Sequence, residues 1–245
     1  MTRELEHLAE IARAAGKIAQ GARKTLSVEK KPDGSLVTNG DRDAELFLRR
    51  ELIQLVPDSN VSGEEFGFEN EGENGVWLVD PIDGTSNFSF GSPLWGNSIA
   101  LYVGGEFRLA AIDLPDLGET YVAQLGHGSF VNEKPLPPII EGPILSHELV
   151  SIGERALGYL GRAAVPGNLR YSGAFVIDGA WVASQRYRGL VGGGEHLYDA
   201  AASLLICQEL GAVASLTDLP KYLTTEPLPT WTLFPRGAQL NPAPH

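Results

Sequence analysis

Apolar residues return every three or four positions along the first part of the chain, which is the spacing of one helix face. The stripe covers residues 3–24 and is rich in alanine, so it predicts an amphipathic helix that packs closely against a neighbour. A second helix is expected to open within residues 38–43, where Asp41 or Asp43 would serve as its N-cap, and to end at Pro57. The stripe of the first helix consists of Leu5, Leu8, Ala12, Ala15, Ala19 and Ala22.

The middle of the chain carries apolar runs that predict strands. Gly104 and Gly105 separate two of these runs and are typical of a two-residue hairpin, so the sheet is expected to be antiparallel. The polar segment 66–75 is expected to form a mobile loop. The expected strands cover residues 61–65, 76–80, 97–103, 107–112 and 119–123, with a further turn and strand at 126–132.

A proline-rich segment at 134–146 predicts a boundary between two lobes of one compact unit, residues 1–134 and 135–245. The second lobe is expected to alternate strands and helices, and its last helix should stop at Gly211. The tail from Leu216 holds several prolines and is expected to be loose at its end. The expected elements are a strand at 149–152, a helix at 172–184, a strand at 187–191 and a helix at 200–210.

Composition narrows the class of protein. The formal net charge is −12, from 31 acidic and 19 basic residues, which argues against binding a nucleic-acid backbone. The single cysteine, Cys207, excludes an internal disulfide and a cysteine-based zinc cluster. No secretory signal and no run of about 18 apolar residues is visible, so no membrane partner and a cytoplasmic location are expected.

Two carboxylates close together mark the most informative stretch. The buried strand is expected to end at Asp80, because Pro81 interrupts the ladder, and Asp83 follows three residues later. Gly84 and Thr85 then begin a turn or helix whose free N–H groups could receive an anion. Paired carboxylates repel unless a cation or proton lies between them, so the stretch suggests a site for a divalent metal and a phosphate. A structural turn with Asp83 as a helix cap explains the stretch equally well.

Other acidic residues have structural explanations when each is considered alone. Asp41 fits a helix cap, and Asp199 fits a charge that complements the dipole of the helix at 200–210. Glu64 and Glu65 would most often be solvated. No single residue therefore decides between a site and ordinary structure.

Taken together, the segments around these acids resemble the inositol monophosphatase family of magnesium-dependent, lithium-sensitive sugar phosphatases. The most specific match is Asp80-Pro81-Ile82-Asp83-Gly84-Thr85-Ser86-Asn87-Phe88, which resembles the family's main signature. The resemblance runs from the first helix to about residue 215 and is poor over 135–170. The other matching segments are Lys30 through Asp41, Gly63-Glu64-Glu65 and Tyr198-Asp199-Ala200-Ala201.

The resemblance implies a layered αβαβα sandwich of the inositol monophosphatase and fructose-1,6-bisphosphatase type, in the α+β class, and a role for each matching residue. Two or three magnesium ions would be held by Glu64, Asp80, Asp83, Asp199 and the backbone carbonyl of Ile82. Asp41 would bind outer-shell water or a further metal, while Glu64 and Thr85 would orient the attacking water. Gly84 and Thr85 would bind the phosphate, and Ser86 and Glu195 would bind the rest of the substrate. Lys30 or Lys31 would lie near the metal site.

The implied activity is hydrolysis of a small polyol or sugar phosphate by a phosphoric monoester hydrolase that is commonly a homodimer. Inositol 1-phosphate, fructose 1,6-bisphosphate and histidinol phosphate are the candidate substrates. Gly192 stands where inositol-cleaving relatives carry a glutamate that contacts a substrate hydroxyl, so inositol phosphate is less expected. Tyr198 replaces the usual tryptophan, and Ser86-Asn87-Phe88 differs from the Lys-Glu-Phe of nucleotide phosphatases. A family member that binds metal and phosphate without turnover is the alternative of another class.

Overall fold

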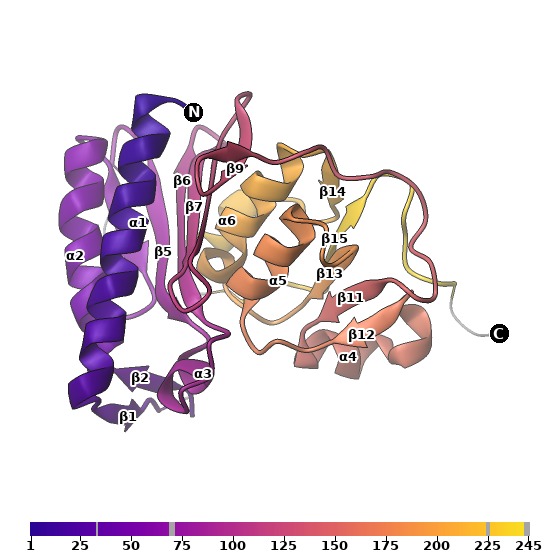
Figure 1. Cartoon of the computed structure of the whole chain (residues 1–245), viewed down its shortest axis with the longest axis horizontal. Helices are drawn as coiled ribbons and strands as arrows, with labels where there is room; N and C mark the ends of the chain where they lie inside the picture. The colour runs from indigo at the N-terminus through magenta and orange to yellow at the C-terminus, as the bar shows by residue number, and fades with distance from the viewer. Residues whose placement is uncertain (33, 69–71, 224–225, 243–245) are drawn as a thin grey trace.

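The computed structural model describes residues 1–32, 34–68, 72–223 and 226–242, and its elements form five layers (Figure 1). Helices α1 (Arg3–Ala22) and α2 (Asn39–Leu55) cover one face of an eight-stranded sheet. Helices α5 (Phe175–Ala183) and α6 (Leu197–Gln208) lie between that sheet and a five-stranded sheet, and α4 (Glu154–Leu160) packs beyond the second sheet. The predicted layered α+β sandwich is confirmed.

The two N-terminal helices form where the apolar stripe predicted them. All six residues of the α1 stripe are buried, and α1 packs against α2. The expected N-cap of α2 is wrong: Thr38 is the cap, because its hydroxyl accepts hydrogen bonds from the Gly40 and Asp41 amides. The Asp41 carboxylate returns the contact by accepting from the Thr38 amide at 2.8 Å, which completes a capping box.

The eight-stranded sheet runs in the order β10-β9-β8-β7-β6-β5-β3-β4, and all its neighbouring strands are antiparallel except β3 and β5. Both faces of β5 are apolar because both are covered: Trp77 and Val79 pack with α1 and α2, while Val76 and Leu78 pack with α5 and α6. The strands of the eight-stranded sheet are β3 (Asn60–Gly63), β4 (Gly67–Phe68), β5 (Val76–Asp83), β6 (Gly96–Val103), β7 (Glu106–Leu114), β8 (Glu119–Gln124), β9 (Gly128–Val131) and β10 (Lys134–Pro135).

Strand β5 does not end at Asp80, so that expectation is wrong. It continues through Pro81 to Asp83, and its register against β6 shifts between Asp80 and Asp83. Pro81 has no amide proton to donate, and the register shift accommodates it. The ladder of hydrogen bonds between β5 and β6 is then broken at only one position. The bulge places Asp80 and Asp83 together at the end of the strand. A five-residue helix, α3 (Thr85–Ser89), begins immediately after it.

The second sheet has the order β12-β11-β13-β15-β14, and the strand between β13 and β14 comes from the proline-containing tail. Neither that strand nor β12 nor α4 was predicted from the sequence. Residues 243–245, the expected loose end, and residues 69–71 of the expected mobile loop lie outside the described residues. The strands are β11 (Leu149–Ile152), β12 (Asn168–Arg170), β13 (Gly189–Gly192), β14 (Ala212–Ala214) and β15 (Trp231–Pro235), and a separate hairpin pairs β1 (Val28–Lys30) with β2 (Leu36–Thr38).

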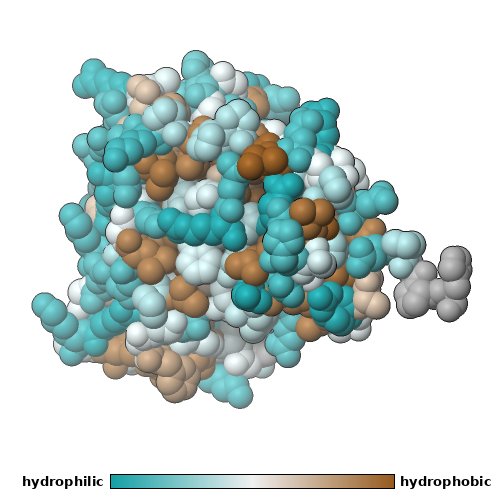
Figure 2. All heavy atoms as spheres, turned by 45° about the vertical axis from the view of Figure 1, so that its right-hand side comes forward, coloured by the Kyte–Doolittle hydropathy of each residue, from teal (hydrophilic) through white to brown (hydrophobic). Residues whose placement is uncertain are grey.

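The core is continuous across residues 134–135, because α6 packs on β6 and β7 of the first sheet. The division into two lobes stays a prediction. The surface in Figure 2 mixes hydrophilic side chains with small apolar patches. Across the described part of the chain, the helices are too short or too polar to cross a membrane.

Candidate active site

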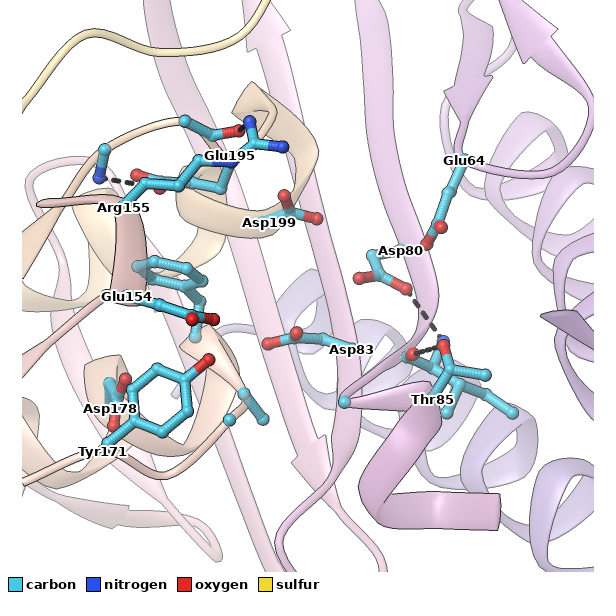
Figure 3. Close-up of a pocket in the computed structure, with 18 residues that line it drawn as sticks. Glu64, Asp80, Asp83, Thr85, Glu154, Arg155, Tyr171, Asp178, Glu195 and Asp199 are labelled. Atoms are coloured by element: carbon cyan, nitrogen blue, oxygen red, sulfur yellow. Dashed lines mark hydrogen bonds between the residues drawn. The ribbon is translucent and has the colours of Figure 1, made fainter. Parts of the chain in front are cut away.

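A cavity of about 320 Å³ opens where β5, α3, α4, α5 and the loop before α6 meet (Figure 3). It lies at the end of β5, where the sandwich layers are not sealed by apolar packing. Charged side chains of one sign dominate its lining, with seven carboxylates against one guanidinium. These residues are Glu64, Asp80, Asp83, Glu154, Asp178, Glu195, Asp199 and Arg155.

Asp80 and Asp83 are held rigidly by backbone amides. The Ile82 amide donates to Asp80 Oδ1 at 2.9 Å, and the Val176 amide at the start of α5 donates to Asp83 Oδ2 at 2.6 Å. Burial raises the pKa of Asp83 to about 8; the hydrogen bond from the Val176 amide opposes this rise, and the neighbouring carboxylates of Asp178 and Glu64 add to it. Burial and the charges of Glu64, Asp83 and Asp199 likewise raise the pKa of Asp80.

Asp199 faces the same cavity from the first turn of α6. Its Oδ2 accepts from the His196 amide at 2.8 Å, so it caps α6 in addition to facing the cavity. The Ser98 hydroxyl of β6 donates to the Tyr198 carbonyl at 2.7 Å, which anchors this helix start to the first sheet. Burial and the charges of Asp83 and Glu64 raise the pKa of Asp199, so these acids share one electrostatic environment.

Thr85 connects the cavity to α2. Its hydroxyl donates to the Ile82 carbonyl at 3.1 Å and lies 3.4 Å from Asp41 Oδ1. Asp41 is fully buried, and burial raises its pKa to about 6. Gly84 has a φ of 85°, and a side chain there would meet Ala174 Cβ at 2.9 Å, so the turn into α3 requires glycine.

Glu64 is oriented by Lys31 in this structure. Lys31 Nζ lies 2.9 Å from Glu64 Oε1 and 2.7 Å from Glu65 Oε1. Lys30, the other candidate, is exposed on β1. Lys30 is the last residue of β1, whereas Lys31 lies just beyond the strand, where its amide donates to the Ser35 carbonyl at 2.8 Å.

The structure brings most of the predicted site residues to one cavity. Asp41 lies behind it and touches it through Thr85, whereas Ser86 is exposed and does not line it. Four lining residues with polar side chains were not predicted: Glu154 and Arg155 fall in the region of poor family resemblance, Tyr171 follows it directly, and Asp178 lies in the apolar helix α5. The predicted residues on the cavity wall are Glu64, Asp80, Ile82, Asp83, Gly84, Thr85, Glu195 and Asp199.

The donor set suits a hard divalent cation. Buried carboxylates that raise one another's pKa are stabilised in their charged form by a cation between them, and oxygen ligands are those magnesium prefers. Within residues 1–242 as far as the structure describes them, no three His, Cys, Asp or Glu side chains already surround a single ion position. Glu64 in particular is turned toward Lys31.

Comparison with known sequences agrees with this site. The model of the inositol monophosphatase family matches residues 1–228. A histidinol-phosphatase from Chlorobaculum parvum is 41% identical over 138 residues, a match that spans 56% of this chain and 53% of that relative. An inositol-1-monophosphatase from Rhizobium meliloti is 33% identical over 206 residues, which cover 78% of this chain and 76% of the relative.

Solved structures agree on the fold. An inositol monophosphatase (IMPase) from Thermotoga maritima superposes with a TM-score of 0.80 and 26% identity, covering 95% of this chain and 92% of that one. The extragenic suppressor protein suhB from Bartonella henselae gives 0.81 with 24% identity, over 96% and 94% of the two chains. Fold and site thus define the class of the metal-dependent phosphoric monoester hydrolases. Within that class, the chain belongs to the inositol monophosphatase family, which confirms the family and the enzyme class predicted from the motifs.

Proposed function

We propose that this chain is a magnesium-dependent phosphomonoesterase that hydrolyses a small phosphorylated alcohol with water as the nucleophile. The observation that carries the proposal is the convergence of Glu64, Asp80, Asp83 and Asp199 on one cavity at the end of β5. These four carboxylates, with the Ile82 carbonyl, would hold two or three ions. Bound magnesium would supply charge neutralisation for the phosphoryl group and activation of water.

The other residues of the chain position the reactants. Thr85 is fixed by the Ile82 carbonyl and by Asp41, so its hydroxyl is placed to orient the attacking water together with Glu64. The amides of Gly84 and Thr85 would receive phosphoryl oxygens. Glu195 lines the cavity on the side of the leaving alcohol, whereas Ser86 would reach the substrate only from the exposed rim.

A phosphate-release assay tests the proposal. Purified protein is incubated with inositol 1-phosphate, fructose 1,6-bisphosphate or histidinol phosphate, with magnesium and with excess chelator. We expect magnesium-dependent turnover of at least one compound, and a fall of about 100-fold or more in Asp83→Asn, because that change removes a charged ligand. Asp58→Asn is the matched control, because Asp58 is exposed and has a φ of 62° that asparagine also adopts. The activity of this variant should equal that of the unchanged protein.

Two outcomes would overturn the proposal. Silence with all substrates would contradict it, as would turnover that survives chelation. Metal binding without hydrolysis, unchanged by Asp83→Asn, would instead favour the non-catalytic alternative. Among the three substrates, the 41% identity to a histidinol-phosphatase favours an amino-alcohol phosphate.

We also propose that the enzyme is a cytoplasmic homodimer that binds neither nucleic acid nor membrane. The family resemblance supports the dimer, and the net charge of −12 disfavours a nucleic-acid backbone as partner. Light scattering on the eluting protein decides the oligomeric state, and a mass of 26.3 kDa would show a monomer.

A further inference from the structure

Helix α3, which carries Thr85, is supported by a small apolar cluster of its own. Figure 1 shows α3 beside the end of α1 and the hairpin of β1 and β2. The cluster is fully buried and consists of Ala19, Ile82, Phe88 and Trp95. The Phe88 and Trp95 rings meet edge to face, with centroids 4.7 Å apart. The cluster thus joins the residues on both sides of Thr85 to α1.

The Arg23 guanidinium lies against this cluster. Arg23 is the first residue after α1, and its Cζ is 4.5 Å from the centre of the Phe88 ring and 5.0 Å from that of Trp95. Both distances are within the range of a cation–π interaction. Its Nη2 also donates to the Ser92 carbonyl at 3.3 Å, just beyond the end of α3. One planar group therefore holds α3 and the loop that follows it against the end of α1.

Asp116, in the turn between β7 and β8, fixes the orientation of this guanidinium. Its Oδ2 accepts from Arg23 Nη1 at 2.6 Å and from Trp95 Nε1 at 2.7 Å, and its Oδ1 accepts from Gln20 Nε2 at 2.8 Å. Burial raises the pKa of Asp116, but the three hydrogen bonds lower it more, so the ion pair is present at neutral pH. Donors from three segments thus hold the carboxylate, and through it the guanidinium, in one place.

The position of the Thr85 hydroxyl depends on where α3 lies. This hydroxyl is 3.1 Å from the Ile82 carbonyl and 3.4 Å from Asp41 Oδ1, and the second distance is long for a hydrogen bond between two oxygens. A shift of α3 would therefore separate Thr85 from Asp41 and from the water that Glu64 orients. Arg23 does not line the cavity, so it would act on the site through α3.

We propose that Arg23 is a positioning residue for the phosphatase reaction: its guanidinium keeps α3 where the Thr85 hydroxyl can orient the attacking water. The inference rests on the proposed phosphomonoesterase function and adds to it a residue outside the cavity. Arginine suits this role, because a planar cation can stack on aromatic rings while it donates to a carboxylate and a carbonyl. Lysine would keep the charge without this geometry.

Hydrogen–deuterium exchange measures the hold of Arg23 on α3 without metal or substrate. The Phe88 amide donates to the Gly84 carbonyl at 2.9 Å, so its exchange reports the opening of α3. Arg23→Met keeps an apolar chain over the rings but removes the charge and the donors. This variant should exchange the Phe88 amide several-fold faster than the unchanged protein.

Arg186→Met is the matched control. Arg186 also pairs with an acid, at 2.6 Å from Glu119, and it also lies over an indole ring, 5.9 Å from the centre of Trp181. Neither Arg186 nor Glu119 lines the cavity or belongs to the cluster around α3. The variant loses a similar ion pair elsewhere, so exchange in α3 and kcat should both stay unchanged.

A double-mutant cycle tests whether Arg23 acts through Thr85. The substrate is inositol 1-phosphate, fructose 1,6-bisphosphate or histidinol phosphate, whichever is turned over fastest with saturating magnesium. Arg23→Met should lower kcat about tenfold, and Thr85→Ala should lower it further. The combined variant should be no slower than Thr85→Ala alone, because the hydroxyl that Arg23 positions is already absent. A loss of folded protein would instead make the two effects multiply.

The outcomes separate the inference from the proposed function. Multiplying losses, an unchanged exchange of the Phe88 amide, or an equal loss of kcat in Arg186→Met would overturn the positioning role while the phosphatase proposal stands. Should Arg23→Met fail to fold, Arg23→Lys takes its place in both experiments, with smaller effects of the same pattern. Absence of magnesium-dependent phosphate release by the unchanged protein would overturn the proposed function, whereas the exchange result would still be measurable.

Discussion

At the scale of single residues, structural and functional explanations of an acid turn out to be compatible. Asp41 completes the capping box of α2 through Oδ2 and lies 3.4 Å from the Thr85 hydroxyl through Oδ1. Asp199 accepts from the His196 amide and lines the cavity. Two oxygens per carboxylate allow one to satisfy an orphan amide of a helix while the other stays available. Helix ends are therefore a rigid way to present acids to a site.

Lys31 provides a residue-scale prediction. Its ammonium contacts Glu64 and Glu65, so it opposes cation binding at Glu64 by electrostatic repulsion of about 1 kcal/mol in a partly exposed site. Lys31→Gln should therefore lower the magnesium concentration for half-maximal binding several-fold, measured by calorimetry. Lys30→Gln, one residue away on exposed β1, is the control and should have no effect. Equal effects of both changes would show that only net charge matters.

At the scale of elements, α1 illustrates how packing overrides helix propensity. Gly16 and Gly21 lie in the same helix, but only Gly16 faces the sheet. A Cβ at Gly16 would lie 2.4 Å from Asp113 Oδ2 and 2.5 Å from Pro115 Cγ, whereas a Cβ at Gly21 would meet nothing within 4 Å. Glycine at position 16 is thus required by the close approach of helix and sheet.

The two glycines predict opposite effects of one substitution. Gly21→Ala should raise the free energy of unfolding by up to about 1 kcal/mol, because alanine is the better helix former. Gly16→Ala should lower it by ~1–3 kcal/mol, because the overpacked methyl forces α1 away from β7. Urea denaturation of both variants measures the difference. A stabilising Gly16→Ala would contradict the close packing described here.

Strand β15 is one of the elements that were not predicted from the sequence. It pairs with β13 on one side and β14 on the other, so the tail supplies an inner strand of the second sheet. Leu233 is fully buried in the core beneath α5 and α6, whereas Val213 on β14 is 49% exposed.

Leu233→Ala should lower the free energy of unfolding by ~2–5 kcal/mol, because it opens a cavity in a closed core. Val213→Ala, a truncation in the neighbouring strand at an exposed position, should change it by less than about 1 kcal/mol. Thermal unfolding followed by circular dichroism compares the two. Similar losses in both variants would show that the tail does not form an inner strand.

At the scale of the whole molecule, one sheet end concentrates buried acids, and this couples stability to pH. Burial raises the pKa of Asp41 to about 6, of Asp178 to about 7 and of Asp83 to about 8, and it raises the pKa of Asp80 as well. Each group has an ordinary pKa near 4 in the unfolded chain. At pH values between the unfolded-state and folded-state pKa of these acids, the folded protein binds more protons than the unfolded chain. The free energy of unfolding therefore falls as pH rises.

Metal-free protein should therefore lose stability steadily from about pH 4 to about pH 8. Acids whose pKa is lowered in the folded protein, such as Asp116, make the free energy of unfolding rise with pH. They do so only at pH values below their ordinary pKa. Saturating magnesium should flatten or reverse the slope, because ions bind the deprotonated carboxylates. Urea denaturation across this range, with chelator and with magnesium, measures both slopes. A metal-free protein that gains stability between pH 4 and pH 8 would contradict the raised pKa values of these buried acids.

The sequence by itself determined what depends on neighbours along the chain. The helical spacing of apolar residues predicted α1. The short stretch from Asp80 to Asp83 predicted that these two acids lie together, because only a few bonds connect them. The family resemblance, rather than periodicity, linked Glu64 and Asp199 to the same site. Only the tertiary structure decided that β15 enters the second sheet, that Lys31 meets Glu64, and that Glu154 and Asp178 face the cavity. Those contacts join distant segments through packing and pairing, which no local pattern of apolar and polar residues encodes.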